Sequence, residues 1–485
     1  MAPIRSRVFT TLRRVVRATR PVDSRTRAAL DRRWSELPEG VKTPAQALGR
    51  HAVGCEGTHG VFPKCNLTCT PCYHSVDANK VRVDGEHTLR EVESQMAFLA
   101  AERGPRAHAQ LIGGEVSLLS PEDHAAALKI MRDHGREPMS FTHGDFDYDY
   151  LRNVVVDAAG RRRFRRVSFA AHFDSLMRGR RGIPRPRRES DLSDYRRRFT
   201  EMFARLREEH GVAAYLAHNM TVTPENLDEV SDVVRDVVGM DYSMLSFQPA
   251  AFVGDSRRWH DGYRDVDIDA VWQQIERGLG QRVAYGAIQF GEPRCNRTAL
   301  GFTFGDHWYP FVDADVDAEV RARDDFYAHL GGVNFGGTHP ALLAIRVGRV
   351  LLAYPRGYVV AARWAGSLVR RCGGVRLLFA ALIRREVHPM TFVVHRFMDA
   401  ADVAPAWAMM QAGTPADDPA IRATQERLAA CTYTMAHPET GKLVPACAQH
   451  SVLDPDENAS LRKLLPLSVA TGHDVGVRAQ SRQAR

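Results

Sequence analysis

The feature that most constrains the fold of this chain is a regular alternation of strand and helix patterns between residues 60 and 250. Short apolar runs predict strands at 60–64, 107–112, 138–142, 166–170, 212–218 and 242–247. Amphipathic stretches between these runs predict helices, for example at 88–104 and 193–210. Alternation of this kind is typical of a parallel sheet that is covered by helices.

Six strand units favour an α/β fold with a partial (β/α)6 barrel over a closed eight-stranded barrel, although a doubly wound sheet fits the same periodicity. In each of these folds, ligands bind at the carboxyl ends of the strands. The polar motifs described below all fall at such ends. The chain has 485 residues, and we expect a C-terminal α+β extension beyond the barrel.

Composition shifts predict the organisation of the rest of the chain. We expect a basic, partly disordered leader at 1–50, the barrel at 51–250, a bridging region at 251–385, a cysteine-containing domain at 386–465 and a polar tail at 466–485. Within the bridging region, residues 341–385 contain nine arginines and no acid among apolar residues. This segment is suited either to a membrane interface or to helices that pack on the barrel with their arginines directed to water.

The net charge of +8 is concentrated at the N-terminus, where residues 1–50 hold twelve Lys or Arg against four acids. Such a leader can touch anionic lipid or remain solvated. No basic motif is interleaved with aromatic residues, so we expect no nucleic-acid partner. The arginines at the start of the leader are Arg5, Arg7, Arg13, Arg14, Arg17 and Arg20.

The cysteine usage indicates a reducing compartment. Eight cysteines in 485 residues are too few for a secreted disulfide framework, and three of them fall within eight residues. We see no signal peptide and no apolar run of the roughly 20 residues that cross a bilayer. We therefore expect a cytoplasmic protein, with peripheral contact at the inner membrane surface as an open alternative.

The motif Cys65-Asn-Leu-Thr-Cys69-Thr-Pro-Cys72 places three thiols on one loop, which can wrap around a single [4Fe–4S] cluster. A cluster that is closed by protein takes four cysteines, so three leave one iron open for a ligand. Two alternatives remain. One is a zinc site with His74 or Cys55 as fourth ligand, and the other is a ferredoxin-like electron-transfer cluster.

This loop, at the start of the expected barrel, resembles the hallmark of the radical S-adenosylmethionine superfamily, and the resemblance covers residues 60–250. It implies that the open iron binds the methionine part of S-adenosylmethionine and that a flavodoxin- or ferredoxin-type donor supplies electrons. It also implies hydrogen abstraction from an unactivated C–H bond. Many members have an aromatic residue just before the third cysteine, whereas this chain has Pro71 there and Tyr73 after it. Tyr73 is therefore the candidate for the adenine contact.

Polar residues at the other strand ends are candidates for binding the cofactor. After the second strand, Gly113 and Gly114 permit close approach of the backbone, and Glu115 can pair with an ammonium group. The family resemblance implies that this motif holds the amino group of the cofactor, and that later strand ends lie near its carboxylate, ribose or adenine. A turn or a helix cap is the alternative at each position. The further candidates are Asp174, Ser175, Asn219 and Gln248, with His143 and Asp145 as possible substrate contacts.

Five cysteines lie outside the triplet. Cys372 falls in the apolar arginine-rich segment and is interpreted as structural. The other four have polar neighbours that suggest loops, and four thiolates can hold an auxiliary [4Fe–4S] cluster. Four unrelated free cysteines are the alternative. The candidate ligands are Cys55, Cys295, Cys431 and Cys447.

The C-terminal segment resembles one subgroup of the superfamily, which includes archaeal tetraether-lipid synthases and related pterin methyltransferases. The similar positions are Phe397-Met398-Asp399, Cys431, and 437–447, which ends in Pro445-Ala446-Cys447. The resemblance implies an auxiliary cluster, one at most in this chain, and favours a lipid or another apolar chain as substrate. A methyltransferase-like or peptide-modifying enzyme with a soluble substrate is the alternative, and a non-enzymatic iron–sulfur scaffold fits less well. No catalytic residue beyond the cluster is identified.

Overall fold

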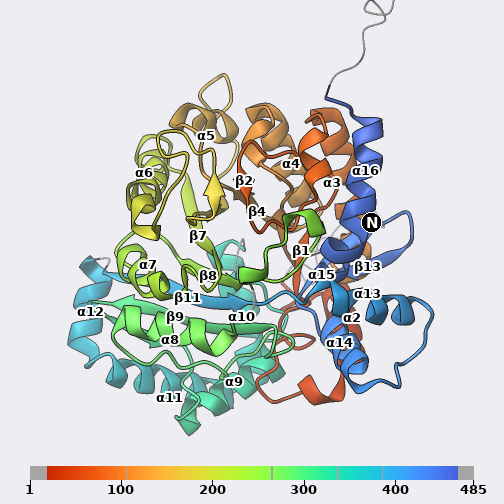
Figure 1. Cartoon of the computed structure of the whole chain (residues 1–485). Helices are drawn as coiled ribbons and strands as arrows, with labels where there is room; N and C mark the ends of the chain where they lie inside the picture. The colour runs from red at the N-terminus through yellow and green to blue at the C-terminus, as the bar shows by residue number, and fades with distance from the viewer. Residues whose placement is uncertain (1–18, 106, 264–265, 336–337, 385, 468–485) are drawn as a thin grey trace, which may run out of the picture.

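The structure is a computed structural model that describes residues 19–105, 107–263, 266–335, 338–384 and 386–467. Eleven strands form one curved sheet in the order β10-β9-β11-β8-β7-β5-β4-β3-β1-β12-β13, with helices packed on it (Figure 1). The central strands from β12 to β11 are all parallel, and β13, β9 and β10 are antiparallel to their neighbours. This is an α/β fold with a partial (β/α)6 barrel and a C-terminal extension, as the sequence predicts.

The strands of this sheet are β1 (Cys55–Gly57), β3 (Ala107–Leu111), β4 (Arg136–Thr142), β5 (Arg166–His172), β7 (Ala213–Val222), β8 (Met244–Pro249), β9 (Asn296–Phe304), β10 (His307–Pro310), β11 (Val387–His395), β12 (Tyr433–His437) and β13 (Lys442–Pro445). Two further strands, β2 (Thr68–Cys69) and β6 (Met177–Arg178), form a separate antiparallel pair.

The helices are α2 (Ser24–Glu36), α3 (Gly85–Arg103), α4 (Pro121–Asp133), α5 (Tyr148–Val155), α6 (Ser193–His210), α7 (Val230–Val237), α8 (Ile268–Leu279), α9 (Asp317–His329), α10 (Pro340–Ala353), α11 (Arg356–Arg371), α12 (Val375–Arg384), α13 (Ala400–Gln411), α14 (Pro419–Ala429), α15 (Ala446–Ala448) and α16 (Asp454–Leu464).

Local sequence signals account for the helices between the barrel strands. At α4 the Ser120 hydroxyl accepts a hydrogen bond from the Asp123 N–H, and Pro121 occupies the first turn, where its missing N–H costs nothing. At the other end of a helix, Gly211 adopts a left-handed conformation after α6 and ends it. The apolar faces of these helices and the buried strand residues form one continuous core, which holds the sheet in its curved shape.

The expected first strand at 60–64 is wrong. The strand that joins the sheet is β1, and it is only three residues long. After it, the Thr58 hydroxyl donates to Ile112 O (2.7 Å) and Gly60 takes a left-handed conformation (φ 65°), so the chain leaves the ladder. Residues 62–64 instead run against the turn after β3 and form the entry to the cysteine loop.

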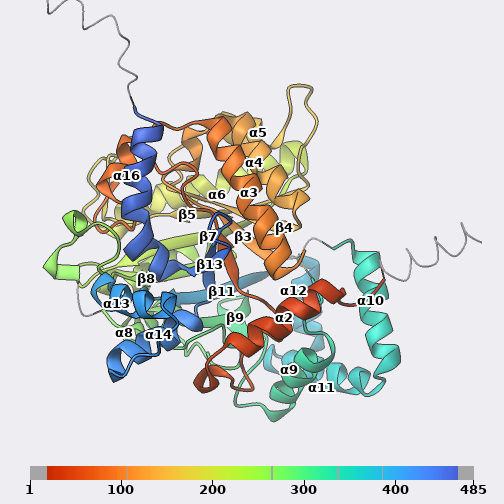
Figure 2. The same ribbon diagram turned by 90° about the vertical axis from the view of Figure 1, so that its right-hand side faces the viewer.

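The expected domain boundaries do not coincide with boundaries of the sheet. Residues 24–36 of the basic leader form α2, which buries Ala29 and Leu30 against the body of the protein. Both flanks of the barrel sheet come from the C-terminal part of the chain, since β11 pairs with β8 and β12 pairs with β1 (Figure 2). Five of the six arginines at the start of the leader, and almost all of the expected tail, lie outside the described residues.

Candidate functional site

The cysteine loop is held by contacts on both sides of the triplet. The Cys65 N–H donates to Asn79 Oδ1 (3.0 Å), and the Leu67 N–H donates to Cys65 Sγ (3.4 Å). Cys69 belongs to β2, which pairs with β6 at Met177. The loop is therefore fixed in space by hydrogen bonds of its own backbone.

The three thiols lie close enough to influence one another. Burial raises the pKa of Cys65 to about 12, and both Glu115 and Cys72 add to this rise. Burial raises the pKa of Cys69 well above its usual value, and Cys72 and Asp174 raise it further. Thiols in such a place ionise when a cation or cluster compensates their charge.

Arg258 is a neighbour of the triplet that sequence analysis missed. Its guanidinium donates to Cys69 O (3.4 Å) and Ser75 O (3.3 Å), and its positive charge opposes the effect of burial on the pKa of Cys72. The buried Nε atom of Arg258 has no hydrogen-bond partner in the structure. Arg258 lies in the segment after the last barrel strand, which carries no recognisable motif, so only the fold brings it here.

The glycine pair after β3 is required by the cysteine loop itself. A Cβ atom on Gly114 would lie 2.1 Å from Lys64 O, and one on Gly113 would lie 2.7 Å from the Phe62 ring. The Gly114 N–H donates to Phe62 O (2.8 Å) and the Glu115 N–H donates to Lys64 O (2.9 Å). The two glycines thus admit the protein's own incoming backbone, which positions the triplet against β3.

Glu115 is fully buried and holds three neighbours. Its carboxylate accepts hydrogen bonds from Ser117 N–H (2.9 Å), Thr142 Oγ1 (2.7 Å) and His143 N–H (2.8 Å). A carboxylate offers about four acceptor positions, and His143 Nε2 lies 3.4 Å from Glu115 Oε2 beside the fourth. Glu115 therefore joins the ends of β3 and β4, whatever else it binds.

The remaining predicted residues at the ends of β4 and β5 are engaged in local networks. The His143 side chain lies 2.8 Å from Asn66 Oδ1 inside the cysteine loop, and Asp145 is paired with Arg181. The Asp174 carboxylate contacts His172 Nε2 (2.6 Å) and accepts from the Thr221 and Leu176 N–H groups. Ser175 donates its N–H to Glu189, which binds Arg196.

The predicted residues on β7 and β8 make fewer hydrogen bonds. The Nδ2 atom of buried Asn219 has no hydrogen-bond partner, and Gln248 contacts Ser246 at 3.3 Å.

Tyr73, which follows the triplet, contacts two other parts of the chain. Its hydroxyl donates to Gly113 O (3.2 Å), and its ring lies 4.4 Å from that of His450. Tyr73 thus packs between the cysteine loop and the C-terminal segment.

Several buried polar atoms around the loop lack partners: both ring nitrogens of His74, Ser75 Oγ, Arg258 Nε and Asn219 Nδ2. Buried polar groups are bonded in the great majority of cases, and an exception calls for a bound ion, water or ligand. These atoms fit a polar cofactor beside a cluster. Among the residues that the structure describes, no three Cys, His, Asp or Glu side chains are placed to hold a single metal ion.

Cys431 lies within electrostatic reach of the other three predicted auxiliary cysteines, although the four span almost the whole chain. The Cys55 N–H donates to Thr432 O (2.7 Å), beside Cys431. Cys431 contributes to the raised pKa of Cys55, Cys295 and Cys447, which places all three thiols within its electrostatic reach. Cys55 lies in β1 and Cys447 in α15, so these two do not lie in the loops that the sequence suggested.

Three arginines surround this second cysteine set. Arg427 Nε donates to Cys295 Sγ (3.2 Å), and Arg33 donates to Cys431 O (2.7 Å). Burial raises the pKa of Cys55 to about 11, and the positive charge of Arg103 opposes this rise. Positive charge next to several thiols favours an anionic thiolate cluster. The sequence showed no sign of this, because the three arginines come from separate helices.

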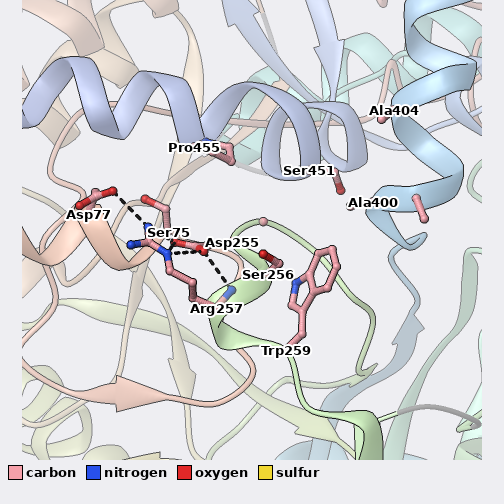
Figure 3. Close-up of a pocket in the computed structure, with 12 residues that line it drawn as sticks. Ser75, Asp77, Asp255, Ser256, Arg257, Trp259, Ala400, Ala404, Ser451 and Pro455 are labelled. Atoms are coloured by element: carbon pink, nitrogen blue, oxygen red, sulfur yellow. Dashed lines mark hydrogen bonds and ion pairs between the residues drawn. The ribbon is translucent and has the colours of Figure 1, made fainter.

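A hollow of about 540 Å³ opens beside the cysteine loop, between the segment after β8 and the starts of α13 and α16 (Figure 3). At one side Arg257 bridges Asp255 and Asp77, at 2.6 and 3.1 Å. At the other side lie Trp259 and the small residues of α13. A second hollow of about 410 Å³ shares Trp259 and Ala401 with the first, so the two are neighbours.

No protein-family model matches the chain, and no curated protein sequence is similar to it. Its structure is similar in part to that of Streptococcus suis SuiB bound to S-adenosylmethionine, with 12% identity and a TM-score of 0.31 over 47% of each chain. It is also similar to native anSMEcpe with bound AdoMet, with 15% identity and a TM-score of 0.30 over 47% of this chain and 63% of that one. With TM-scores this low, these similarities assign neither a family nor an activity.

Proposed function

We propose that this chain is a radical S-adenosylmethionine enzyme. The observation that carries the proposal is the loop of Cys65, Cys69 and Cys72, which is packed against the ends of β3 and β4 by Gly114, Glu115 and His143. A three-thiol loop at the ligand-binding edge of a partial barrel suits a cluster with one open iron. When bound, a [4Fe–4S] cluster with S-adenosylmethionine supplies a 5′-deoxyadenosyl radical that abstracts hydrogen from an unactivated C–H bond.

The residues of the chain then have separable roles in the proposal. The triplet holds the cluster, and Arg258 compensates the negative charge of its thiolates. The Glu115 carboxylate binds the ammonium group of the cofactor in place of its 3.4 Å contact with His143 Nε2, and Asn219 Nδ2 offers a buried donor for its polar part. Asp174, Ser175, Gln248 and Tyr73 line the same region and remain candidates for its other contacts.

Cys55, Cys295, Cys431 and Cys447 are proposed to hold a second [4Fe–4S] cluster. Support comes from their convergence on Cys431 and from the arginines around them. A variant with all three triplet cysteines changed to Ala should then still bind about four irons. Adding Cys431→Ala should remove them, whereas adding Cys372→Ala, at the buried end of α11, should not. A triplet variant without iron would contradict the second cluster.

For the substrate we propose a molecule with an apolar chain, as the C-terminal resemblance suggests. The hollow beside the cysteine loop supports this, since Phe252 stacks on Trp259 at 5.2 Å and small alanines of α13 face them. The Arg257 cluster at one end suits a polar head group. A methyltransferase-like or peptide-modifying activity is the competing outcome. A flavodoxin- or ferredoxin-type donor in the reducing cytoplasm would supply the electrons.

The test is anaerobic reconstitution with iron and sulfide, followed by reduction with dithionite and addition of S-adenosylmethionine. The wild-type chain and Cys372→Ala should release 5′-deoxyadenosine, and Cys65→Ala should not. Deuterated lipid extract, peptides and small soluble metabolites then compete as hydrogen donors, and transfer of deuterium into 5′-deoxyadenosine identifies the class. Product release by Cys65→Ala at the wild-type rate would refute the assignment.

A further inference from the structure

The outer side of three successive helices, α10, α11 and α12, carries an unusual number of exposed apolar residues. Of the fourteen large apolar side chains that are exposed in the described structure, nine belong to these helices. The most exposed are Leu352 (77%), Val375 (69%), Ile383 (68%) and Phe379 (63%). Contiguous exposed apolar surface in a folded protein marks an interaction site. The other five are Ile345, Tyr358, Val359, Leu377 and Leu382.

The inner sides of α10 and α11 are attached to the protein, and α12 buries Ala381. Trp364 Nε1 on α11 donates to Phe311 O (2.8 Å), and Arg371 makes two hydrogen bonds to the buried Glu319 of α9, at 3.0 and 2.8 Å. At the end of α10, Tyr354 stacks on His329 with ring centroids 3.8 Å apart. The exposed apolar residues therefore belong to helices with a fixed inner face, and their outer face is available to a partner.

The charge within these three helices has a single sign, although the exposed Glu386 follows α12 and lies 4.0 Å from Arg384. Residues 341–385 contain nine arginines and no acid. Arg356, Arg363, Arg370 and Arg376 are without an ion-pair partner within the described part of the chain, and the first three of these are exposed on α11. A partner that covers such a surface must accept apolar side chains and supply negative charge.

The described part of the chain begins beside these helices. Arg349 on α10 donates to Thr19 Oγ1 (2.7 Å), and Thr19 is the first residue that the structure describes. In both views α11 lies at the opposite end of the molecule from α5 (Figures 1 and 2).

We propose that the outer face of α10–α12 is a peripheral binding surface for an anionic lipid bilayer. The apolar side chains of α12 enter the boundary between head groups and acyl chains, and the arginines lie at the level of the lipid phosphates. Among the described residues, no helix is long and apolar enough to cross a membrane. The surface is built from amphipathic helices that lie on a bilayer, and it is independent of the chemistry proposed above.

Vesicle flotation with the purified full-length chain tests this proposal. The chain should float with vesicles of phosphatidylcholine and phosphatidylglycerol, much less with phosphatidylcholine alone, and less as salt is added. Each arginine near an anionic surface contributes about fivefold, so the triple variant R363Q/R370Q/R376Q should bind on the order of a hundredfold more weakly. The matched control R161Q/R205Q/R235Q removes three exposed arginines on the barrel and should have a much smaller effect.

A second variant tests the apolar part of the surface. Phe379→Ser with Ile383→Ser leaves the charge unchanged and should abolish most of the binding that persists at high salt. Far-UV circular dichroism verifies that both variants keep the wild-type helix content. The proposal is overturned if the wild-type chain does not prefer anionic vesicles, if the barrel control loses as much binding as R363Q/R370Q/R376Q, or if the Phe379→Ser, Ile383→Ser variant binds like the wild-type chain. Self-association that depends on Phe379, without vesicle binding, would identify the face as an interface between copies instead.

Discussion

Replacement of Glu115 by Gln separates its structural role from its proposed role in cofactor binding. The carboxylate accepts hydrogen bonds from Ser117 N–H, Thr142 Oγ1 and His143 N–H, all within 2.9 Å, in a fully buried position. In Glu115→Gln, the amide oxygen can keep the first two partners. The NH₂ group then faces the His143 N–H, and two donors cannot bond to each other.

The loss of stability expected for Glu115→Gln follows from the number of hydrogen bonds that are lost. One charge-assisted hydrogen bond is lost and one buried donor is left without a partner, which costs about 1–3 kcal/mol in the free energy of unfolding. Glu115→Ala would leave three buried donors without a partner, at a cost that approaches the roughly 5–15 kcal/mol that stabilises a typical domain. The Gln variant is therefore the useful one, because it should still fold.

Two measurements distinguish the roles. Urea unfolding of the cluster-free chain, followed by circular dichroism, should show the loss of stability, with Glu86→Gln on the exposed start of α3 as an unaffected control. Calorimetry on the reconstituted protein should show S-adenosylmethionine binding weakened roughly ten- to a hundredfold. Unchanged stability would refute the hydrogen-bond network described here. Lost stability with unchanged cofactor affinity would make Glu115 a positioning residue only.

Three further outcomes are expected. Arg258→Gln should lower the reduction potential of the reconstituted cluster, measured by EPR-monitored titration, because a positive charge beside the thiolates is lost; an unchanged potential would place its charge out of reach. Gly114→Ala should prevent stable cluster assembly, as judged by bound iron, because its Cβ would clash with backbone, whereas Gly366→Ala, with open space around it, should assemble normally. Burial disfavours the charged form of His59, but its contacts with the Glu457 carboxylate and a backbone carbonyl raise its pKa to about 9. The charged His59 then contributes fully to stability below about pH 6.5, which is the pKa of a histidine in the unfolded chain. This contribution is lost as the pH rises through about 9, the pKa of His59 in the folded chain. His59→Gln should flatten this part of the stability profile in urea unfolding, and an equally steep profile would contradict a charged imidazole.

Much of the barrel was determined by the sequence alone. The barrel strands β3, β4, β5, β7 and β8 were each expected within a few residues of their observed positions, because each apolar run is flanked by a strongly patterned helix, whereas the short strand β6 was not expected. The cysteine triplet and the Gly-Gly-Glu turn were likewise visible as local patterns. The first strand was misplaced, because the apolar residues 61–63 pack against a turn and not in a ladder, and nothing local distinguishes the two.

The tertiary structure decided everything that depends on partners far apart in the chain. The pairing of β12 with β1, which brings Cys431 beside Cys55, joins segments almost 400 residues apart, and no spacing rule encodes it. The same holds for Arg258 at the cysteine loop and for Arg33 and Arg427 at the second cysteine set. A strand carries the same alternation whichever edge it joins, and an arginine has the same local pattern whether it faces water or a thiol. Local periodicity therefore determined the elements, and only the closure of the sheet determined which side chains meet.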